Sequence, residues 1–495
     1  MFVTKIKVAV VGAGIAGLAS AIRLQHKGYQ VHVFDTGSVP GGKMGERFLG
    51  KYRFDTGPSL FTRPDLVDEL FSLCGLKSDE YFHYKPLDVV CHYFYPEGLE
   101  FRAPAGKDAL ASAMEQSFGE PAQNVRRFFR KSAFLYRITA PVFLERSLHR
   151  LDTYIRPSGL RGIMNLPFID MFRSMAYRNE RSFNTPYAQQ FFNRFATYNG
   201  SSPYKAPATL NVIPHLETEL GAFYPQGGMV QIARSLHQLA ERIGVQFHFN
   251  SKVKQILVEQ GHVTGLALES GAVFHAPMVL SNADVYHTYR HLLPVPMPKR
   301  VAEVDSSSSA LIFYWGIKKQ FPQLGLHNIF FSEDYRKEFD QIWGQRSTPE
   351  DPTVYVNITS KCDPSDAPEY GENWFVMVNV PANDGHDWAQ LRKDVRCRVL
   401  QKLSSLLKVN LESLIEEEDV LDPVLIEART SSFRGALYGS SSNKRMAAFF
   451  RQRNKSEQIG GLYFAGGSVH PGGGIPLCLL SAKIAASLTP AQRGV

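Results

Sequence analysis

The chain has 495 residues, of which 44% are hydrophobic and 21% are charged. This balance excludes an intrinsically disordered protein, and the length exceeds what one hydrophobic core usually supports, so we expect two or three substructures. The net charge of +8 is a modest excess that does not indicate nucleic-acid binding. No segment offers about 18 consecutive apolar residues, so the sequence predicts no transmembrane helix.

The spacing of the cysteines and three absent motifs exclude other classes of protein. The chain lacks a G-x-S-x-G elbow, an H-E-x-x-H pair and a C-x-x-C pair, so no hydrolase chemistry and no metal site are predicted. Wide spacing favours buried free thiols in a reducing compartment over a disulfide framework. The five thiols are Cys74, Cys91, Cys362, Cys397 and Cys478.

A glycine-rich turn follows the first predicted strand, Val8–Val11. Gly12, Gly14 and Gly17 stand at G-x-G-x-x-G spacing. The first suits a tight turn, the second lets a pyrophosphate approach the backbone, and the third lets helix and strand pack closely. This spacing predicts a dinucleotide-binding Rossmann unit, with a glycine-rich turn in a nucleotide-free Rossmann unit as the alternative.

The predicted helix after this turn begins with Ile15 and Ala16 and ends before Gly28. A second strand, Val31–Phe34, then leads to Asp35. A helix N-terminus suits a diphosphate, and a carboxylate at the end of the second strand can bind ribose hydroxyls. The combination favours dinucleotide binding over the nucleotide-free alternative.

The next segment matches G-x-x-x-x-G-K, but Met44 follows the lysine and offers no hydroxyl for magnesium. We therefore interpret it as a loop that returns to the same cofactor. Gly41 and Gly42 would admit the cofactor and Lys43 would lie near its diphosphate. The alternative is an exposed glycine turn with a solvated lysine.

The residue pattern then changes twice along the chain. A rigid turn is predicted at Phe54–Ser59, around Gly57 and Pro58, and a helix is predicted to begin at Asp65. Short aromatic strands follow between residues 81 and 102, and residues 107–181 are mostly helical in pattern and basic.

Within the basic part, residues 125–165 hold nine Arg or Lys against two acidic residues, a local net charge of +7. Aromatic residues such as Phe128, Phe129 and Phe134 interleave with these charges. Basic residues around an apolar face suit a helix lying on an anionic membrane surface. The alternative is a solvated face over an ordinary helical core.

The middle of the chain predicts a second domain. Asn193–Pro207 is expected to be a loop lining a cavity, and a helix after Gly228 leads into a meander of short strands that begins at Val245. Val279–Asp284 looks like a strand ending at the cofactor. Further strands (Ala310–Gly316, Thr353–Ile358, Trp374–Val380) and a helix (Trp388–Leu407) follow, and Glu416–Asp419 is expected to be a solvated turn.

A second glycine-rich turn lies near the C-terminus. It follows the predicted strand Leu462–Ala465 and ends where a helix opens at Ile475, with Pro476 suited to its first turn. Two such turns at opposite ends of one chain indicate an extended cofactor held between them.

The chain resembles the bacterial-type carotenoid desaturases related to phytoene desaturase. The resemblance rests on GAGIAGL, PGGKMGE, FDTGPSLF, ATYNGSSPY, FYPQGGM, SNADVYHTYRHLL and FAGGSVHPGGGIPLCLLSAK, in this order over nearly the full chain. Within that family, LFTRPDLVDELF and NRFATYNGSSPYKAP most resemble the hydroxycarotenoid 3,4-desaturase branch.

The resemblance implies an α/β fold with three parts. A Rossmann-type FAD-binding domain would comprise residues 1–80, 224–300 and 440–495. A mixed α+β substrate-binding domain would comprise residues 81–106, 182–223 and 301–439. A helical, basic, membrane-associating subdomain would comprise residues 107–181.

Carried over by position, the resemblance also implies the residues that bind FAD. Many relatives have Glu where Asp35 stands, and Gly467-Ser468 stands where other flavoproteins place an Asp on the ribityl chain. Asp284 and Tyr198 are candidates for the proton acceptor, with a structural role as the alternative for each. The implied FAD-binding residues are Gly12, Gly14, Ile15, Ala16, Gly17, Asp35, Gly41, Gly42, Lys43, Gly57, Pro58, Val253, Gly466, Gly467, Gly473, Gly474 and Ile475.

The activity implied is FAD-dependent desaturation of an acyclic or monocyclic carotenoid end group, specifically 3,4-desaturation of a 1-hydroxy or gamma-carotene-type substrate. Hydride would pass to flavin, and the helix at Gly474–Ile475 would stabilise charge on the reduced flavin. The expected partners are the carotenoid, a membrane surface and an electron acceptor such as quinone or oxygen, with no nucleic acid. The expected place is the cytoplasmic face of the membrane, as a peripheral protein.

Alternatives remain open. Phytoene desaturase and carotenoid isomerase belong to the same family. An amine or protoporphyrinogen oxidase is another flavin enzyme, and a Rossmann binder of prenylated proteins is a non-enzymatic class.

Overall fold

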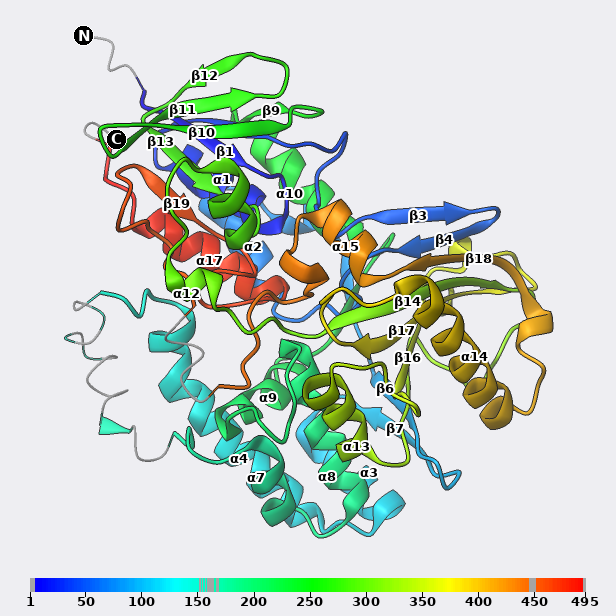
Figure 1. Cartoon of the computed structure of the whole chain (residues 1–495). Helices are drawn as coiled ribbons and strands as arrows, with labels where there is room; N and C mark the ends of the chain where they lie inside the picture. Colours follow the sequence, from blue (N-terminus) through cyan, green and yellow to red (C-terminus); the bar gives the residue numbers. More distant parts are fainter. Residues whose placement is uncertain are drawn as a thin grey trace.

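The computed structural model describes residues 5–150, 153, 155, 157, 164–165, 169–444 and 451–492. Its first sheet has five parallel strands in the order β19-β13-β1-β2-β9, at the upper left of Figure 1. Strands from both ends of the chain, β1 and β19, flank β13 in this sheet, which confirms the predicted Rossmann-type α/β unit. The strands are β1 (Lys7–Val11), β2 (Gln30–Phe34), β9 (Gln246–His248), β13 (Met278–Ser281) and β19 (Leu462–Phe464).

Both faces of this sheet are covered, because alternate residues of a strand point to opposite sides. Val8 and Val10 of β1 belong to a core shared with four helices, whereas Ala9 and Val11 face a three-stranded antiparallel sheet. The helices are α1 (Ile15–His26), α2 (Asp65–Leu73), α10 (Val230–Arg242) and α17 (Ile475–Ser487). The antiparallel strands are β10 (Val253–Glu259), β11 (His262–Leu268) and β12 (Val273–His275).

One strand of the first sheet was assigned wrongly from the sequence. The segment at Val245 was expected to open the meander, but β9 pairs with β2 in parallel. Helix α10 immediately precedes β9 and packs in the same core as α1, so β9 completes a strand–helix–strand crossover. The meander begins at β10.

The second sheet has seven strands in the order β18-β14-β17-β16-β15-β6-β7. Helix α14 (Trp388–Leu407) covers one face, as the right side of Figure 1 shows. The opposite face carries two separate clusters, one formed with helices and one formed with the hairpin β3 (Glu46–Leu49) and β4 (Tyr52–Asp55). The strands are β6 (Val89–Phe94), β7 (Glu100–Pro104), β14 (Ser309–Ile317), β15 (His327–Phe330), β16 (Val354–Ile358), β17 (Glu372–Val380) and β18 (Ile415–Leu421).

The acidic run Glu416–Asp419 is not the solvated turn expected from the sequence. It lies within β18, which pairs with β14. Its side chains find donors on neighbouring elements: Glu416 accepts a hydrogen bond from Tyr52 at 2.6 Å, and Glu418 accepts one from Trp315 Nε1 at 2.8 Å. These distant partners allow four consecutive acidic residues to form an edge strand.

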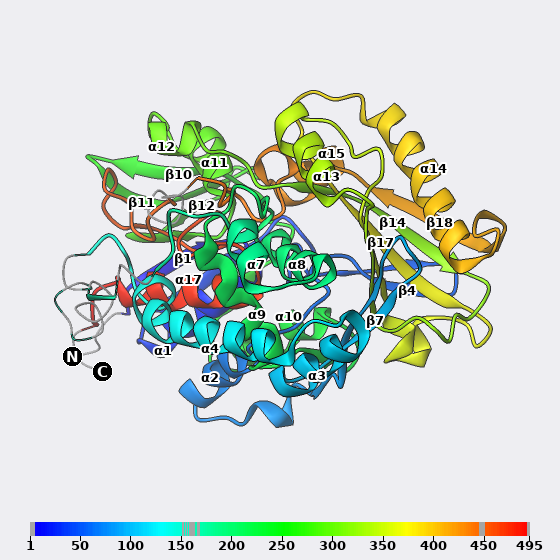
Figure 2. The same cartoon turned by 90° about the horizontal axis from the view of Figure 1, so that it is seen from below.

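The helical part lies below the two sheets in Figure 1, and Figure 2 shows α3, α4, α7 and α8 grouped together. The segment Asn193–Pro207, expected to be a loop, begins with a 3-10 helix. The elements are α3 (Lys107–Phe118), α4 (Ala122–Thr139), η2 (Ala140–Leu144), α7 (Met175–Ser182), α8 (Pro186–Asn193), η4 (Arg194–Asn199), η5 (Ala208–Val212) and α9 (Ile213–Thr218).

The basic segment has an ordinary buried core under part of its surface. Phe128 and Phe129 on α4 are 5% and 1% exposed and pack among aromatic residues, so they do not form a lipid-facing surface. Arg156 and Arg161, counted in the basic excess, lie outside the described residues. Among the helices that are described, none combines the length and apolar character needed to cross a membrane.

The remaining elements are short. All five cysteines are free, but only Cys91 is buried as expected: Cys397, on the solvent side of α14, is exposed, and the other three are partly exposed (Cys74, Cys362 and Cys478). The short elements are η1 (Ser78–Glu80), β5 (Tyr84–Pro86), β8 (Phe223–Pro225), α11 (Val285–His287), η6 (Thr288–Leu292), α12 (Lys299–Ala302), α13 (Tyr335–Asp340), η7 (Gln341–Gln345), η8 (Thr359–Lys361), η9 (Pro364–Asp366), η10 (Glu412–Leu414), α15 (Pro423–Thr430) and η11 (Phe433–Gly435).

Candidate cofactor-binding site

The first glycine turn connects β1 to α1 with no room for side chains. Gly12 has a φ of +99°, and a Cβ added at Gly17 would lie 2.0 Å from Gly12 O. A Cβ at Gly14 would lie 2.8 Å from Asn282 Oδ1. Gly17 therefore allows the close helix–strand packing predicted from the sequence, whereas Gly14 opens the space in front of the helix.

The N-terminus of α1 suits an anion. Ile15 and Ala16 in its first turn are 8% and 2% exposed, yet no side chain in the described part of the chain caps this helix end. Buried first-turn N–H groups need a partner, and the helix dipole favours a negative one. A diphosphate fits this position.

Asp35 lies at the end of β2 and holds two loops together. Its Oδ2 accepts a hydrogen bond from Ala13 N at 2.6 Å, and its Oδ1 accepts one from Gly37 N at 2.6 Å. Ser251 N donates to Asp35 O at 2.8 Å, which brings the start of β10 at Val253 next to this carboxylate. Each carboxylate oxygen keeps a further lone pair that can accept a ribose hydroxyl.

The loop that carries the second glycine pair returns to the first turn. Gly41 N donates to Ala13 O at 2.9 Å, and a Cβ at Gly42 would lie 3.3 Å from Gly14 Cα. This placement agrees with the interpretation of the loop as a second wall of the same site. Gly42 and Lys43 are both exposed, so the alternative of an exposed glycine turn with a solvated lysine stays open.

Lys43 lines the interior of the site. Its Nζ donates to Leu437 O at 3.0 Å and to Ala436 O at 3.3 Å, so the ammonium bonds the chain that leads to Tyr438. Desolvation lowers the pKa of Lys43, against the opposing effect of nearby Asp284. The side chain is nevertheless exposed. The exposed part of the side chain remains available to an anionic ligand.

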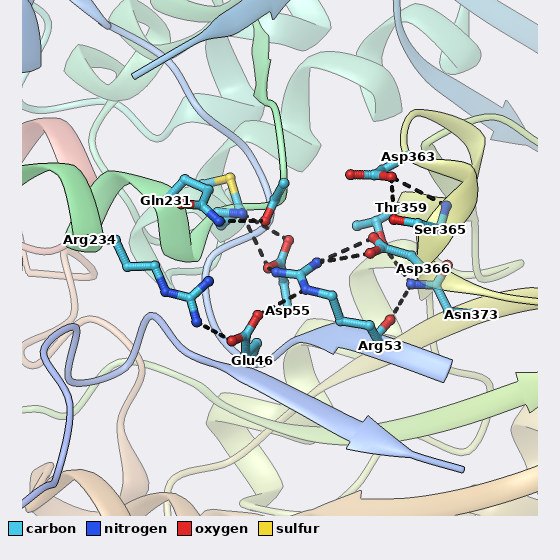
Figure 3. Close-up of polar contacts among 12 residues, drawn as sticks. Glu46, Arg53, Asp55, Gln231, Arg234, Thr359, Asp363, Ser365, Asp366 and Asn373 are labelled. Carbon is cyan, nitrogen blue, oxygen red and sulfur yellow. Dashed lines mark hydrogen bonds and ion pairs between the residues drawn. The ribbon is translucent and has the colours of Figure 1, made fainter. Parts of the chain in front are cut away.

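The turn that contains Gly57 and Pro58 is fixed against Lys43. A Cβ at Gly57 would lie 2.1 Å from Lys43 O. An ion network just before this turn, shown in Figure 3, attaches it to the second sheet, because Asn373 Nδ2 of β17 donates to Arg53 O at 2.6 Å. Arg53 contacts Asp55 at 2.9 Å and Asp366 at 3.3 Å.

The same network reaches the Rossmann-type unit, because Asp55 also accepts hydrogen bonds from Met229 N, at 3.1 and 3.2 Å, where α10 begins. Arg53 contacts Glu46 at 3.0 Å on the neighbouring strand. Buried ion pairs of this kind fix geometry more reliably than they add stability.

The C-terminal turn meets the first turn at Asn282. Its N–H donates to Val11 O at 2.8 Å and its Nδ2 donates to Ala465 O at 2.9 Å. A Cβ at Gly466 would lie 2.8 Å from the same Nδ2. Asn282 therefore joins the two glycine turns. Sequence reasoning missed this role, although the position of Asn282 at the end of a predicted central strand was a usable signal.

The last glycine of the C-terminal turn borders open space. Gly467 packs beside Gly473, whose added Cβ would lie 2.9 Å from Tyr438 Cα. At Gly474 no atom of the described residues lies within 4 Å of the added Cβ, and no described side chain caps α17, which begins at Ile475. A second uncapped helix end thus faces the space between the turns.

The two candidate proton acceptors are both engaged in the fold. Asp284 caps α11 by accepting a hydrogen bond from Tyr286 N at 2.8 Å, and its burial raises its pKa. Tyr198 donates to Glu217 and accepts from Arg194 Nη1 at 3.0 Å, and burial raises its pKa well above the usual value. Both residues therefore fit the structural role that was the alternative to proton acceptance.

The predicted FAD-binding residues therefore surround one site, formed by two glycine turns, two uncapped helix ends and one carboxylate. This set fits an extended dinucleotide with an anionic centre. Within the described ranges, no group of three His, Cys, Asp or Glu side chains is arranged to hold a metal ion.

Comparison with known proteins agrees with this geometry. Residues 15–488 match the model of the flavin-containing amine oxidoreductases. The chain is 49% identical to a 1-hydroxycarotenoid 3,4-desaturase of Flavobacterium sp. (strain P99-3), over 98% of this chain and 99% of that protein. It is 31% identical to a 4,4'-diaponeurosporene oxygenase of Staphylococcus aureus (strain bovine RF122 / ET3-1), over 96% of each.

Solved structures share the fold at low sequence identity. Putrescine oxidase bound to putrescine matches 98% of each chain with a TM-score of 0.62 and 16% identity. Cyclohexylamine oxidase from Brevibacterium oxydans IH-35A matches 98% of each chain with a TM-score of 0.59 and 13% identity. The chain belongs to the flavin-containing amine oxidoreductase family, in the group that includes the 1-hydroxycarotenoid 3,4-desaturase, and its cofactor is FAD.

Proposed function

We propose that this protein desaturates the 3,4-bond of a carotenoid end group that carries a 1-hydroxyl. The observation that carries the proposal is the 49% identity to a 1-hydroxycarotenoid 3,4-desaturase along almost the whole of both chains. The two glycine turns and uncapped helix ends supply the FAD site that such a reaction requires.

The protein contributes alignment and electrostatics in this proposal. FAD, when bound, supplies the acceptor for a hydride. The uncapped N-terminus of α17 at Gly474–Ile475 favours negative charge in front of it. A polyene delocalises the positive charge left by hydride loss, so correct placement of the end group is the main task of the protein.

The diaponeurosporene oxygenase relatives favour a second candidate, oxygenation of a carotenoid end group. The two activities differ in product mass. Desaturation removes two hydrogens and lengthens the conjugated system, whereas oxygenation adds oxygen. Incubation of the FAD-loaded protein with a 1-hydroxycarotenoid in liposomes, followed by mass and absorption analysis, distinguishes them.

We also propose that the basic helical segment places the protein on the cytoplasmic face of a membrane, with a quinone or oxygen taking the electrons. Three large hydrophobic side chains near this segment are highly exposed: Ile155 (72%), Met164 (78%) and Phe172 (71%). Exposed basic residues on α4, including Arg127, Arg130, Lys131 and Arg137, lie in the same part of the sequence. Exposed apolar side chains beside basic ones suit an anionic lipid surface.

Changing Arg127, Arg130 and Lys131 to Gln tests this placement. Each charge near an anionic surface contributes roughly 1 kcal/mol, so binding to anionic liposomes should fall by about a hundredfold or more. Activity on detergent-solubilised substrate should be retained. The control changes exposed Lys318 and Lys319, which directly follow β14 of the second sheet. Equal losses of liposome binding in both variants would refute the placement.

A further inference from the structure

A chain of hydrogen bonds runs from the Gly57 turn into the second sheet. Ser59 Oγ lies 2.7 Å from the Tyr355 hydroxyl, which lies 2.7 Å from His327 Nδ1. Asn357 Nδ2 lies 3.2 Å from the same His327 nitrogen. Ser59 and Tyr355 belong neither to the glycine turns nor to the residues predicted to bind FAD.

The direction of this chain follows from its last members. Asn357 Nδ2 donates to Leu326 O at 3.0 Å, which fixes the amide orientation, so the group facing His327 Nδ1 is a donor. We therefore assign His327 Nδ1 as the acceptor, which places the ring proton on Nε2, a buried atom with no hydrogen-bond partner among the described residues. The Tyr355 hydroxyl then also donates to Nδ1 and shares its single lone pair with the Asn357 amide, and the Tyr355 oxygen can accept from Ser59.

This series of hydrogen-bonded side chains does not readily take up a proton. Burial, with a smaller effect from the charge of Arg194, lowers the pKa of His327 to about 3. Since His327 is the base at the end of the chain, it stays neutral at ordinary pH and acts as a fixed acceptor. At the opposite end of these hydrogen bonds, the oxygens of Ser59 and Tyr355 keep lone pairs that can accept a further hydrogen bond.

The Tyr355 ring lies where two hydrophobic clusters of the second sheet meet. Tyr355 is half-buried and packs against both clusters on the same face of the second sheet, the helical one and the one with β3 and β4. Desolvation is the main cause that raises its pKa, and the Tyr438 hydroxyl lies within electrostatic range. Tyr438 in turn packs on Gly473 of the C-terminal glycine turn.

We infer that Ser59 and Tyr355 form a hydroxyl-recognition subsite, in which their oxygens accept a hydrogen bond from the hydroxyl on the end group of the polyene. The inference rests on the proposed function and identifies the residues that select its substrate class. In aromatic surroundings, a substrate hydroxyl without an acceptor loses its hydrogen bonds to water, whereas one at this subsite keeps one. His327 is a positioning residue that orients Tyr355.

Tyr355→Phe tests the subsite by removing one hydroxyl while keeping the ring, and Ser59→Ala provides an independent variant. The control is Tyr314→Phe, on β14 of the same sheet, where the hydroxyl is 3.5 Å from Thr56 O. Two carotenoids that differ by a single hydroxyl at the end group are compared. The measurements are the ratio of their kcat/KM values and the ratio of their Kd values in detergent.

Wild type and Tyr314→Phe should prefer the hydroxylated carotenoid. Tyr355→Phe and Ser59→Ala should each reduce that preference by about three- to tenfold, the effect of one neutral hydrogen bond. An unchanged preference in both variants overturns the inference, and so does an equal loss for both carotenoids. If wild type desaturates neither carotenoid, the proposed function fails, and the Kd ratios alone then support or overturn the subsite.

Discussion

The two inner glycines of the first turn should respond differently to the same substitution. A Cβ at Gly17 would lie 2.0 Å from Gly12 O, a backbone atom that cannot move without separating α1 from β1 by about 1 Å. A Cβ at Gly14 would meet Asn282 Oδ1, the end of a side chain, at 2.8 Å.

The magnitudes follow from these contacts. Overpacking of this kind costs about 1–3 kcal/mol, and alanine in the helix interior offsets about 1 kcal/mol of it, so Gly17→Ala should destabilise the apoprotein by up to about 2 kcal/mol. Gly14→Ala should at most break the bond between Asn282 and Ala465, which costs about 0.5–1.5 kcal/mol. Its main effect should be on the cofactor, because the methyl group takes the space in front of the helix end.

The assay combines thermal unfolding of the apoprotein with titration by FAD. Gly14→Ala should unfold within a few degrees of wild type and bind FAD at least tenfold more weakly, whereas Gly17→Ala should unfold at clearly lower temperature. A Gly14→Ala protein that purifies fully loaded with FAD would refute the assignment of this turn to the diphosphate.

Three further substitutions test other parts of the account. Asp35→Ala should weaken FAD binding by about 1.5–3 kcal/mol, the value of a hydrogen bond to a charged acceptor, and unchanged occupancy at limiting FAD would contradict this. Asn282→Ala should lower FAD affinity about three- to tenfold by loosening both glycine turns, and an unaltered Kd would exclude that role. His470 is 1% exposed and burial lowers its pKa to about 4, against 6.5 in the unfolded chain. The folded state then binds fewer protons between these values, so stability should fall by about 2–3 kcal/mol as pH drops from 6.5 to 4.5. His470→Gln should lessen that fall in calorimetry at a series of pH values, and an identical pH dependence would contradict the reasoning.

Local signals allowed much of the fold to be predicted. The G-x-G-x-x-G spacing, the final Asp35 and the helix start at Ile475 each depend on residues close together in sequence. The predicted helix Trp388–Leu407 has the same bounds as α14. Such elements carry their own periodicity and capping, so one sequence suffices to find them.

Elements that depend on distant partners could not be predicted in the same way. β18 was missed because four acidic residues hide the strand alternation, and the donors that stabilise them, such as Tyr52 and Trp315, are far away in sequence. The sequence pattern places Phe128 and Phe129 on a membrane-facing surface. Their burial depends on tertiary packing against the region of α7 and α8, which no local pattern indicates.

In the candidate site, too, local motifs could be predicted and long-range contacts could not. The glycines were identified by spacing, whereas Asn282 joins two turns that lie more than 400 residues apart in sequence. The bonds among Ser59, His327 and Tyr355 connect positions that share no motif. Polar residues that act through long-range contacts carry no local pattern.

The most direct test of the central claim is product analysis with the FAD-loaded protein and a 1-hydroxycarotenoid in liposomes, with a quinone or oxygen present. The account predicts a product lighter by two hydrogens, with its new double bond at the 3,4-position and absorption at longer wavelength. A product that has gained oxygen, or an unchanged carotenoid in the presence of protein with bound FAD, would contradict it.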